Sequence, residues 1–293
     1  MTPMQTRRRF LTICAALPVA LASGRAGAEP ASIYRGQAMG AAITLHLRHP
    51  EGARLADLAL AEIARLERIF SLYQADSALM RLNASGRLDT PPPEMLDLLS
   101  LCHAVHHASG GRFDPTVQPL WAALAQGEVT DGIARARALI GWEGVRFDRA
   151  AVTLARPGMA LTLNGVAQGY VADRVAALLR AGGLKVGLID TGEISAIGQD
   201  WPVRISGGPR LRLSDRALAT SGLFGTVLDA GGRQGHILSP FGDAVPWQRV
   251  SISAPRAAVA DALSTAACLM PDRAALGAML AQFPGARLED LRG

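Results

Sequence analysis

Two oxygen-bearing side chains stand one helical turn apart near the end of the chain. The stretch Ala257-Ala-Val-Ala-Asp-Ala-Leu-Ser-Thr-Ala-Ala267 is rich in alanine and predicts a helix, so Asp261 and Thr265 share one face. Asp261 has no basic residue within four positions on either side, and a carboxylate among small apolar neighbours is costly unless something positive meets it. Hard oxygen ligands suit Mg²⁺, which also takes water and substrate phosphate. The pattern favours a magnesium site over an exposed polar strip.

A glycine turn in the middle of the chain is the second candidate. In Leu161-Thr-Leu-Asn-Gly-Val-Ala-Gln-Gly-Tyr-Val-Ala-Asp-Arg174, residues 162–163 are expected to end a strand and residues 166–181 to form a helix. Unpaired amides at such a helix start favour an anion, and Gly165 and Gly169 would let a phosphate come close. Taken alone, the same residues also describe an ordinary strand-to-helix turn that uses small residues for packing.

Two single side chains add further candidates. Tyr73 is one of three tyrosines and follows a helix face predicted over residues 55–70. It could stack on a planar ring, although a core aromatic is the commoner case. His236 lies in an expected loop, where contact with a ligand and a bond to the backbone are equally compatible with the sequence.

Three histidines and a dense loop occupy the region between these candidates. His103, His106 and His107 fall at i, i+3 and i+4 of a helix predicted from Pro93 to about Ser109. This spacing could hold a transition metal, but the apolar residues define a different face, so we expect a solvated one. The loop Gly110-Gly-Arg-Phe-Asp-Pro-Thr-Val-Gln-Pro119 must also start a helix, and rigid loops of this kind often carry function.

The elements that position these groups alternate between helix and strand. Residues 42–48 alternate with period two and predict a half-buried strand, and residues 184–190 predict a fully buried one. Strands dominate from there to about residue 254, with residues 219–222 and 235–242 expected as loops at strand ends. Asp76-Ser77 is a good N-cap for a short helix that ends near Asn83. No repeat or low-complexity linker divides the chain.

Residues 1–28 form an expected targeting segment. Thr6-Arg-Arg-Arg-Phe-Leu11 is the twin-arginine pattern, an apolar stretch follows it, and Ala26-Gly27-Ala28 is a cleavage signal. The apolar stretch is too short, and too interrupted by Pro18, to be a good membrane span. The sequence therefore predicts export to the periplasm of a folded chain that begins near Glu29.

Charge and cysteine usage narrow the function class. The 293-residue chain has a formal net charge of +5, but the targeting segment holds four arginines and no acid, which leaves 5 − 4 = +1. No basic patch with interleaved aromatics is present, so nucleic acid is not an expected partner. Cys102 and Cys268 form no C-x-x-C motif and sit in apolar helical patterns. Buried free thiols are the expectation, with one periplasmic disulfide as the alternative.

Taken together, the motifs resemble the FAD:protein FMN transferases, the ApbE family. The resemblance covers nearly all of the mature chain in the family's order, and its motifs are Ala38-Met39-Gly40, Phe70 to Asn83, Gly111 to Pro119, Asn164 to Gly169, Thr191-Gly-Glu193, Ala219-Thr-Ser-Gly222, His236 to Gly242 and Ala260-Asp-Ala-Leu-Ser-Thr265. It implies a single α+β, T-fold-like domain over residues 29–293, with a β-sheet core, surrounding helices and FAD in a cleft. It also implies that FAD is split with Mg²⁺, that FMN moves to a threonine hydroxyl of an acceptor protein, and that AMP is released.

The resemblance assigns roles residue by residue. It implies that the metal site comprises the Gly165 carbonyl, Asp261 and Thr265, with Ser264 beside them, and Asp261 is also the expected catalytic residue. The positions that it implies at the FAD are Met39, Tyr73, Phe113, Asp114, Pro115, Thr162, Gln168, His236 and Ile237. Thr162 and Gln168 stand where many members have an acid and a lysine, and Ser239 replaces a common Asp.

The narrower similarity concerns the acceptor. With its twin-arginine signal, the pattern is similar to the subgroup that serves nitrous-oxide respiration, which implies a membrane flavoprotein as acceptor. Three other functions use the same observations. A periplasmic FAD pyrophosphatase would employ water as nucleophile, a flavin-binding protein would result if Thr162 and Gln168 disable the chemistry, and a structural accessory protein of a respiratory complex would show neither property.

Overall fold

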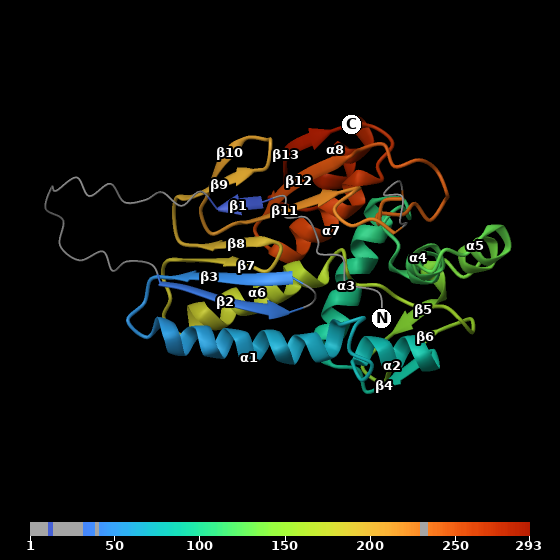
Figure 1. The fold of residues 1–293 in the computed structure, drawn as a ribbon, viewed down its shortest axis with the longest axis horizontal. Coiled ribbons are helices and arrows are strands. Elements are labelled where there is room, and N and C mark those ends of the chain that lie inside the picture. Colours follow the sequence, from blue (N-terminus) through green and yellow to red (C-terminus); the bar gives the residue numbers. More distant parts are fainter. Residues whose placement is uncertain (1–10, 14–31, 39–40, 229–233) are drawn as a thin grey trace, which may run out of the picture.

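An antiparallel sheet forms the centre of the molecule (Figure 1). The structure is a computed structural model, and it describes residues 11–13, 32–38, 41–228 and 234–293. This main sheet has seven strands in the order β13-β12-β11-β8-β7-β3-β2. Their bounds are β2 Ser32–Ala38, β3 Ala41–Leu47, β7 Gly187–Asp190, β8 Ile194–Ile197, β11 Ala217–Gly222, β12 Arg249–Ala254 and β13 Arg287–Arg292. The central strands β7 and β8 are buried throughout, as expected for strands covered on both faces.

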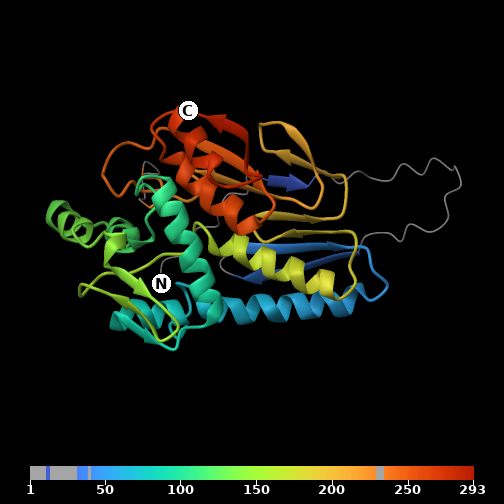
Figure 2. The same cartoon turned by 180° about the vertical axis from the view of Figure 1, so that it is seen from behind.

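Helices cover one face of the main sheet, as the view from behind shows (Figure 2). They are α1 (Gly52–Phe70), α6 (Ala167–Ala181) and α7 (Ala257–Cys268), with α8 (Arg273–Ala281) following α7. The apolar face predicted for α1 is buried. The predicted bounds of α6 and α7 agree with the structure to within one residue at each end. These helices carry both candidate stretches into the centre of the molecule.

A small sheet covers the opposite face. Its order is β1-β9-β10, with β1 at Leu11–Ile13, β9 at Trp201–Ile205 and β10 at Arg210–Leu213. Alternate residues of β9 and β10 point inward, and Val203, Ile205 and Leu213 form a second core with apolar residues of β7, β8 and β11. The domain is therefore layered as helices, main sheet and small sheet.

The remaining elements gather at one end of these layers (Figure 1). They are the helices α2 (Ala78–Ser85), α3 (Pro93–Ala108), α4 (Gln118–Ala125) and α5 (Thr130–Arg137), the short 3-10 helices η1 (Pro115–Val117) and η2 (Trp142–Gly144), and the sheet β4-β6-β5 with strands Arg87–Asp89, Ala151–Leu154 and Val145–Phe147. Ser77 caps α2 by accepting a hydrogen bond from the Met80 amide at 3.0 Å, which confirms the predicted cap.

Two local predictions were wrong. Residues 162–163 are not in a strand. The Thr162 amide donates to the Pro115 carbonyl, and Leu161, just before these residues, is bound by the Asn83 side chain. Its amide nitrogen donates to the Leu161 carbonyl at 2.9 Å, and its oxygen accepts from the Leu161 amide at 2.8 Å. Residues 219–222 are not a loop but part of β11, which pairs in register with β12. Ala219, Thr220 and Gly222 are buried there, and Ser221 is half-buried.

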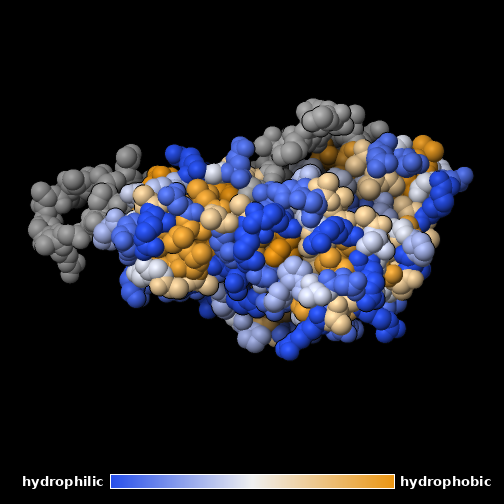
Figure 3. Space-filling view, turned by 90° about the horizontal axis from the view of Figure 1, so that it is seen from below, coloured by the Kyte–Doolittle hydropathy of each residue, from blue (hydrophilic) through white to orange (hydrophobic). Residues whose placement is uncertain are grey.

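The surface seen from the α1 side is mostly hydrophilic, with interrupted apolar patches (Figure 3). Among the helices that the structure describes, none has both the length and the apolar run that crossing a membrane requires. The arginine pair and the cleavage signal of the predicted targeting segment lie outside the described residues.

Candidate active site

Helices α6 and α7 touch at Gly169. A Cβ on this residue would lie 2.3 Å from the Ala257 carbonyl oxygen, so only glycine permits the approach. The Gly169 amide donates to Asp261 Oδ2 at 3.0 Å. Gly169 was expected to let a phosphate come close, and this expectation was wrong. The missing side chain makes room for the backbone of α7, and the amide binds a carboxylate of the protein itself.

The start of α7 is capped from α6. Asp173 accepts hydrogen bonds from the Ala257 amide at 2.6 Å and the Ala258 amide at 3.0 Å. Burial raises the pKa of this carboxyl, while the two amides and Arg256 oppose the shift. Sequence reasoning missed this role, although it had a signal. Position 256, just before the helix, is an arginine rather than one of the usual capping residues, so the cap must come from elsewhere.

One turn of α7 carries a cluster of oxygens. Asp261 and Ser264 are buried, and the Ser264 hydroxyl donates to the Asp261 carbonyl at 3.0 Å. The hydroxyl of Ser221, on β11, lies 2.7 Å from the Ser264 hydroxyl and 3.0 Å from that of Thr265. The structure thus brings together the predicted metal residues of α7 and adds Ser221. The only sequence signal for Ser221 was its place in the Ala219–Gly222 motif.

The glycine turn completes this cluster. A Cβ on Gly165 would lie 3.0 Å from the Thr265 hydroxyl oxygen, so the turn is seated against α7. The predicted donor set of a carboxylate, hydroxyls and the Gly165 carbonyl consists of hard oxygens, which fits Mg²⁺ better than a softer transition metal. No group of three His, Cys, Asp or Glu that could hold a metal occurs within the described ranges. Metal ligation by Gly165, Asp261, Ser264 and Thr265 remains a prediction that the geometry fits.

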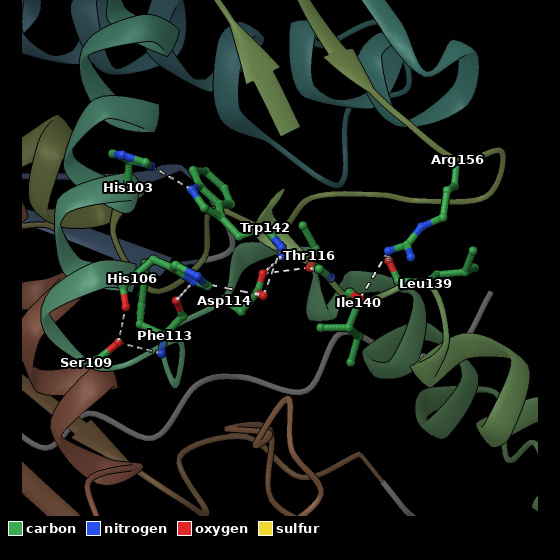
Figure 4. A network of polar contacts seen from close by, with 11 residues as sticks. His103, His106, Ser109, Phe113, Asp114, Thr116, Leu139, Ile140, Trp142 and Arg156 are labelled. Atoms are coloured by element: carbon green, nitrogen blue, oxygen red, sulfur yellow. Dashed lines mark hydrogen bonds and ion pairs between the residues drawn. The ribbon is translucent and has the colours of Figure 1, made fainter. Parts of the chain in front are cut away.

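The loop at Phe113–Thr116 is held by its own carboxylate (Figure 4). Asp114 accepts from the Thr116 amide at 2.8 Å, from the Thr116 hydroxyl at 2.6 Å and from the Trp142 amide at 3.3 Å. Its carboxylate therefore orders the loop. The Thr162 amide donates to the Pro115 carbonyl at 2.9 Å, which joins this predicted FAD loop to the chain just before the glycine turn.

Two of the α3 histidines also hold this loop (Figure 4). His106 Nδ1 lies 2.9 Å from the Phe113 carbonyl, and His103 Nδ1 accepts from the Trp142 indole at 3.0 Å. His103 and His107 are exposed, as expected for a solvated face. The hydrogen bonds of His103 and His106 were not predicted. Because His103 Nδ1 accepts, its other nitrogen carries the proton of the neutral ring. This arrangement disfavours the alternative of metal binding through His103.

Gln168 is buried beside the turn after β7. A Cβ on Gly192 would lie 3.0 Å from the Gln168 side-chain nitrogen, and Gly192 has a φ of +105°. The Thr191 hydroxyl donates to the Gln168 carbonyl at 3.2 Å. Position 168 is therefore packed against Thr191-Gly192, which belong to another motif of the resemblance, and a contact with FAD remains a prediction.

The remaining predicted FAD contacts differ in exposure. Tyr73 is 57% exposed, so it is not a core aromatic. Ile237 and Phe113 are buried, and His236 Nδ1 lies 3.1 Å from the Thr226 carbonyl and 3.3 Å from the Thr226 amide. Met39 lies outside the described residues.

Helix α3 carries a buried thiol. Burial raises the pKa of Cys102, on α3, and the negative charges of Asp261 and Asp114 raise it further. Cys102 and Cys268 are free and buried, which confirms the expected state of the thiols.

Comparison with known proteins shows the family of the chain. Residues 39–286 match the family model described as ApbE family. The chain belongs to the ApbE family. It is 30% identical over 276 residues to the FAD:protein FMN transferase of Treponema pallidum (strain Nichols), covering 76% of this chain and 75% of the relative. It is 26% identical over 275 residues to that of Salmonella typhimurium (strain LT2), covering 81% and 78%.

Solved structures show that the ApbE fold is shared. Pseudomonas stutzeri flavinyl transferase ApbE, in its apo form, superposes with a TM-score of 0.77 at 24% identity, covering 87% of this chain and 89% of that one. The ApbE protein of Thermotoga maritima gives 0.75 at 23% identity, covering 88% and 93%. The predicted α+β domain, with its sheet core and surrounding helices, is confirmed, as is membership of an enzyme family of FAD:protein FMN transferases.

Proposed function

We propose that this ApbE protein transfers the FMN half of FAD to a threonine hydroxyl of an acceptor protein, with Mg²⁺ bound and AMP released. The observation that carries the proposal is the oxygen cluster. Asp261, Thr265 and the Gly165 turn meet where α6 and α7 are locked together, in a chain whose relatives are named FAD:protein FMN transferases.

The reaction balances without an oxidant or an energy source besides FAD. The threonine oxygen forms a bond to the phosphorus of the FMN half, and the bond from that phosphorus to the bridging oxygen breaks. AMP leaves with the bridging oxygen, and the hydroxyl proton is released. Transfer of this type requires positioning and charge neutralisation more than covalent help from the protein.

The residues of the cluster have distinct roles in this proposal. Asp261, Thr265 and the Gly165 carbonyl would hold Mg²⁺, and the ion supplies charge neutralisation at the diphosphate. Gly169 orients the Asp261 carboxylate through its amide, and Ser221 fixes the hydroxyls of Ser264 and Thr265. Asp261 is occupied in this arrangement, so the proton acceptor for the threonine is a different group.

The proposed acceptor and compartment rest on sequence features. The twin-arginine pattern supports export of a folded chain to the periplasm, and the departures at Thr162 and Gln168 are similar to the subgroup that serves nitrous-oxide respiration. We therefore place the target threonine in a periplasm-facing domain of a respiratory membrane flavoprotein.

Two experiments test the function. Mature protein is incubated with FAD and Mg²⁺, with and without the acceptor domain, and products are followed by mass spectrometry. Transfer predicts FMN on a threonine and AMP in equal amounts. FMN and AMP without an acceptor indicate a pyrophosphatase, and FAD bound but unconsumed indicates a binding protein. In a deletion strain with no second family member, the acceptor must lose its flavin fluorescence on a denaturing gel.

A further inference from the structure

An aromatic side chain stands in solvent just after the predicted flavin stretch. Phe241 is 60% exposed and lies four residues beyond Ile237. A single exposed apolar side chain is ordinary on a protein surface. The contacts that hold this one in place distinguish it from an ordinary surface residue.

The turn at Ser239–Asp243 is closed on itself. The Ser239 hydroxyl donates to the Asp243 carboxylate and accepts from the Phe241 amide at 3.2 Å. The Gly242 amide donates to the Ser239 carbonyl, also at 3.2 Å. Gly242 has a φ of +81°, and a Cβ there would lie 2.7 Å from the Arg137 guanidinium. The backbone that presents Phe241 is therefore fixed by hydrogen bonds and by packing against α5.

The ring itself is held by the loop that contains Phe113–Pro115. The Arg112 guanidinium carbon lies 5.5 Å from the centre of the Phe241 ring, and Arg112 Nη1 pairs with Asp243 at 2.8 Å. A Cβ on Gly111 would approach the ring to 3.3 Å. Such contacts remove side-chain freedom before any partner arrives, which lowers the entropic cost of binding.

We propose that Phe241 and its turn are the docking surface for the acceptor protein, with an apolar side chain near the target threonine packing on the ring. The inference rests on the proposed function and names a surface for its protein substrate. The observations at this place favour a polypeptide over a nucleotide phosphate, because the Arg112 charge is paired with Asp243 and the exposed group of the turn is the apolar Phe241 ring. Rigid aromatic residues are the usual anchors of protein interfaces.

The test distinguishes binding of the acceptor protein from binding of FAD. Phe241→Ala is expected to raise the KM for the acceptor domain at least about fivefold, as loss of an interface anchor does. The acceptor used is the domain that loses its flavin in the deletion strain. The Kd for FAD, measured by flavin fluorescence without acceptor, should stay unchanged. Phe241→Leu, which keeps an apolar side chain, should recover part of the KM. Val129→Ala is the matched control, because Val129 is 74% exposed and lies between α4 and α5.

Three results would overturn the inference. An unchanged acceptor KM in Phe241→Ala removes the docking role. A weakened Kd for FAD in the same variant, with the melting temperature preserved, assigns the ring to the flavin. Failure of the wild-type protein to transfer FMN to any acceptor removes the proposed function, and the inference with it.

Discussion

At the scale of single residues, the oxygen cluster depends on one charge and several hydroxyls. Asp261 supplies the charge, and its carboxylate is aimed by the Gly169 amide. Thr265, Ser264 and Ser221 form a neutral hydrogen-bonded set beside it. Because only Asp261 can neutralise a cation, substitutions in this cluster should be unequal in effect.

Asp261→Asn is expected to lower the rate of FMN transfer by more than about 100-fold, because it removes the charge. Thr265→Ala and Ser221→Ala should each lower the rate by roughly 10–100-fold, as the loss of a supporting contact near a metal does. Transfer rates at saturating FAD over a range of Mg²⁺ concentrations measure this order. Circular dichroism and melting temperature serve as folding controls. Wild-type transfer by Asp261→Asn would remove this residue from the metal site.

At the scale of elements, the crossing of α6 and α7 sets the geometry of the cluster. Gly169→Ala places a methyl group 2.3 Å from the Ala257 carbonyl oxygen, so the helices must separate. We expect a loss of about 1–3 kcal/mol or more in the free energy of unfolding. Gly277→Ala on α8 is the control, because nothing lies within 4 Å of its Cβ, and it should gain ~0.5–1 kcal/mol. Equal stabilities in urea for the two variants would contradict the crossing as described.

The cap from Asp173 predicts a pH dependence. Burial, the larger influence, raises the pKa of Asp173 in the folded state above its ordinary value of 3.8. Between that value and the raised pKa, the folded state binds more protons than the unfolded state, so stability falls as pH rises. Asp173→Asn lacks this titration. The difference in free energy of unfolding between the wild type and the variant, measured from unfolding curves, should decrease as the pH rises above 3.8. It should no longer change with pH near neutrality. An advantage that grows over this range would mean that the amides outweigh burial.

At the scale of the whole molecule, the number of thiols shows whether the predicted targeting segment has been removed. The chain has three cysteines, and Cys14 falls within the predicted targeting segment. Protein from the periplasm should therefore show two thiols after unfolding and begin near Glu29. The folded protein should resist alkylation, because Cys102 and Cys268 are fully buried and burial raises the pKa of both. Mass spectrometry after labelling counts the thiols. Three thiols in the periplasmic protein would contradict cleavage near Glu29. Equally efficient export of the Arg7→Lys/Arg8→Lys variant would contradict the twin-arginine signal.

The sequence predicts helices better than it predicts loops. The spacing of apolar residues and the capping residues predicted α1, α2, α6 and α7. These helices form their own backbone hydrogen bonds and bury one face, so their signals are local. Residues 162–163 were wrongly predicted to end a strand. The partners of this stretch come from distant positions, Asn83 for the Leu161 backbone and Pro115 for the Thr162 amide. Ser221 and Asp173 act across the fold and have only weak local signals. The Arg112 and Arg137 contacts that fix Phe241 also arise only when distant segments meet.

The hydrogen bond from Gly169 to Asp261 spans 92 residues of chain, and this separation determines the order in which parts of the site form during synthesis. Closure over so long a stretch is slow compared with the formation of local helices, and a ribosome adds only about 5–20 residues per second. A nascent chain thus displays the Phe113 loop and the glycine turn well before α7 has been synthesised. Under the proposed function, FAD binds at the completed cluster. Its binding would then follow the synthesis of α7, and export of the folded chain by the proposed twin-arginine route would come later still.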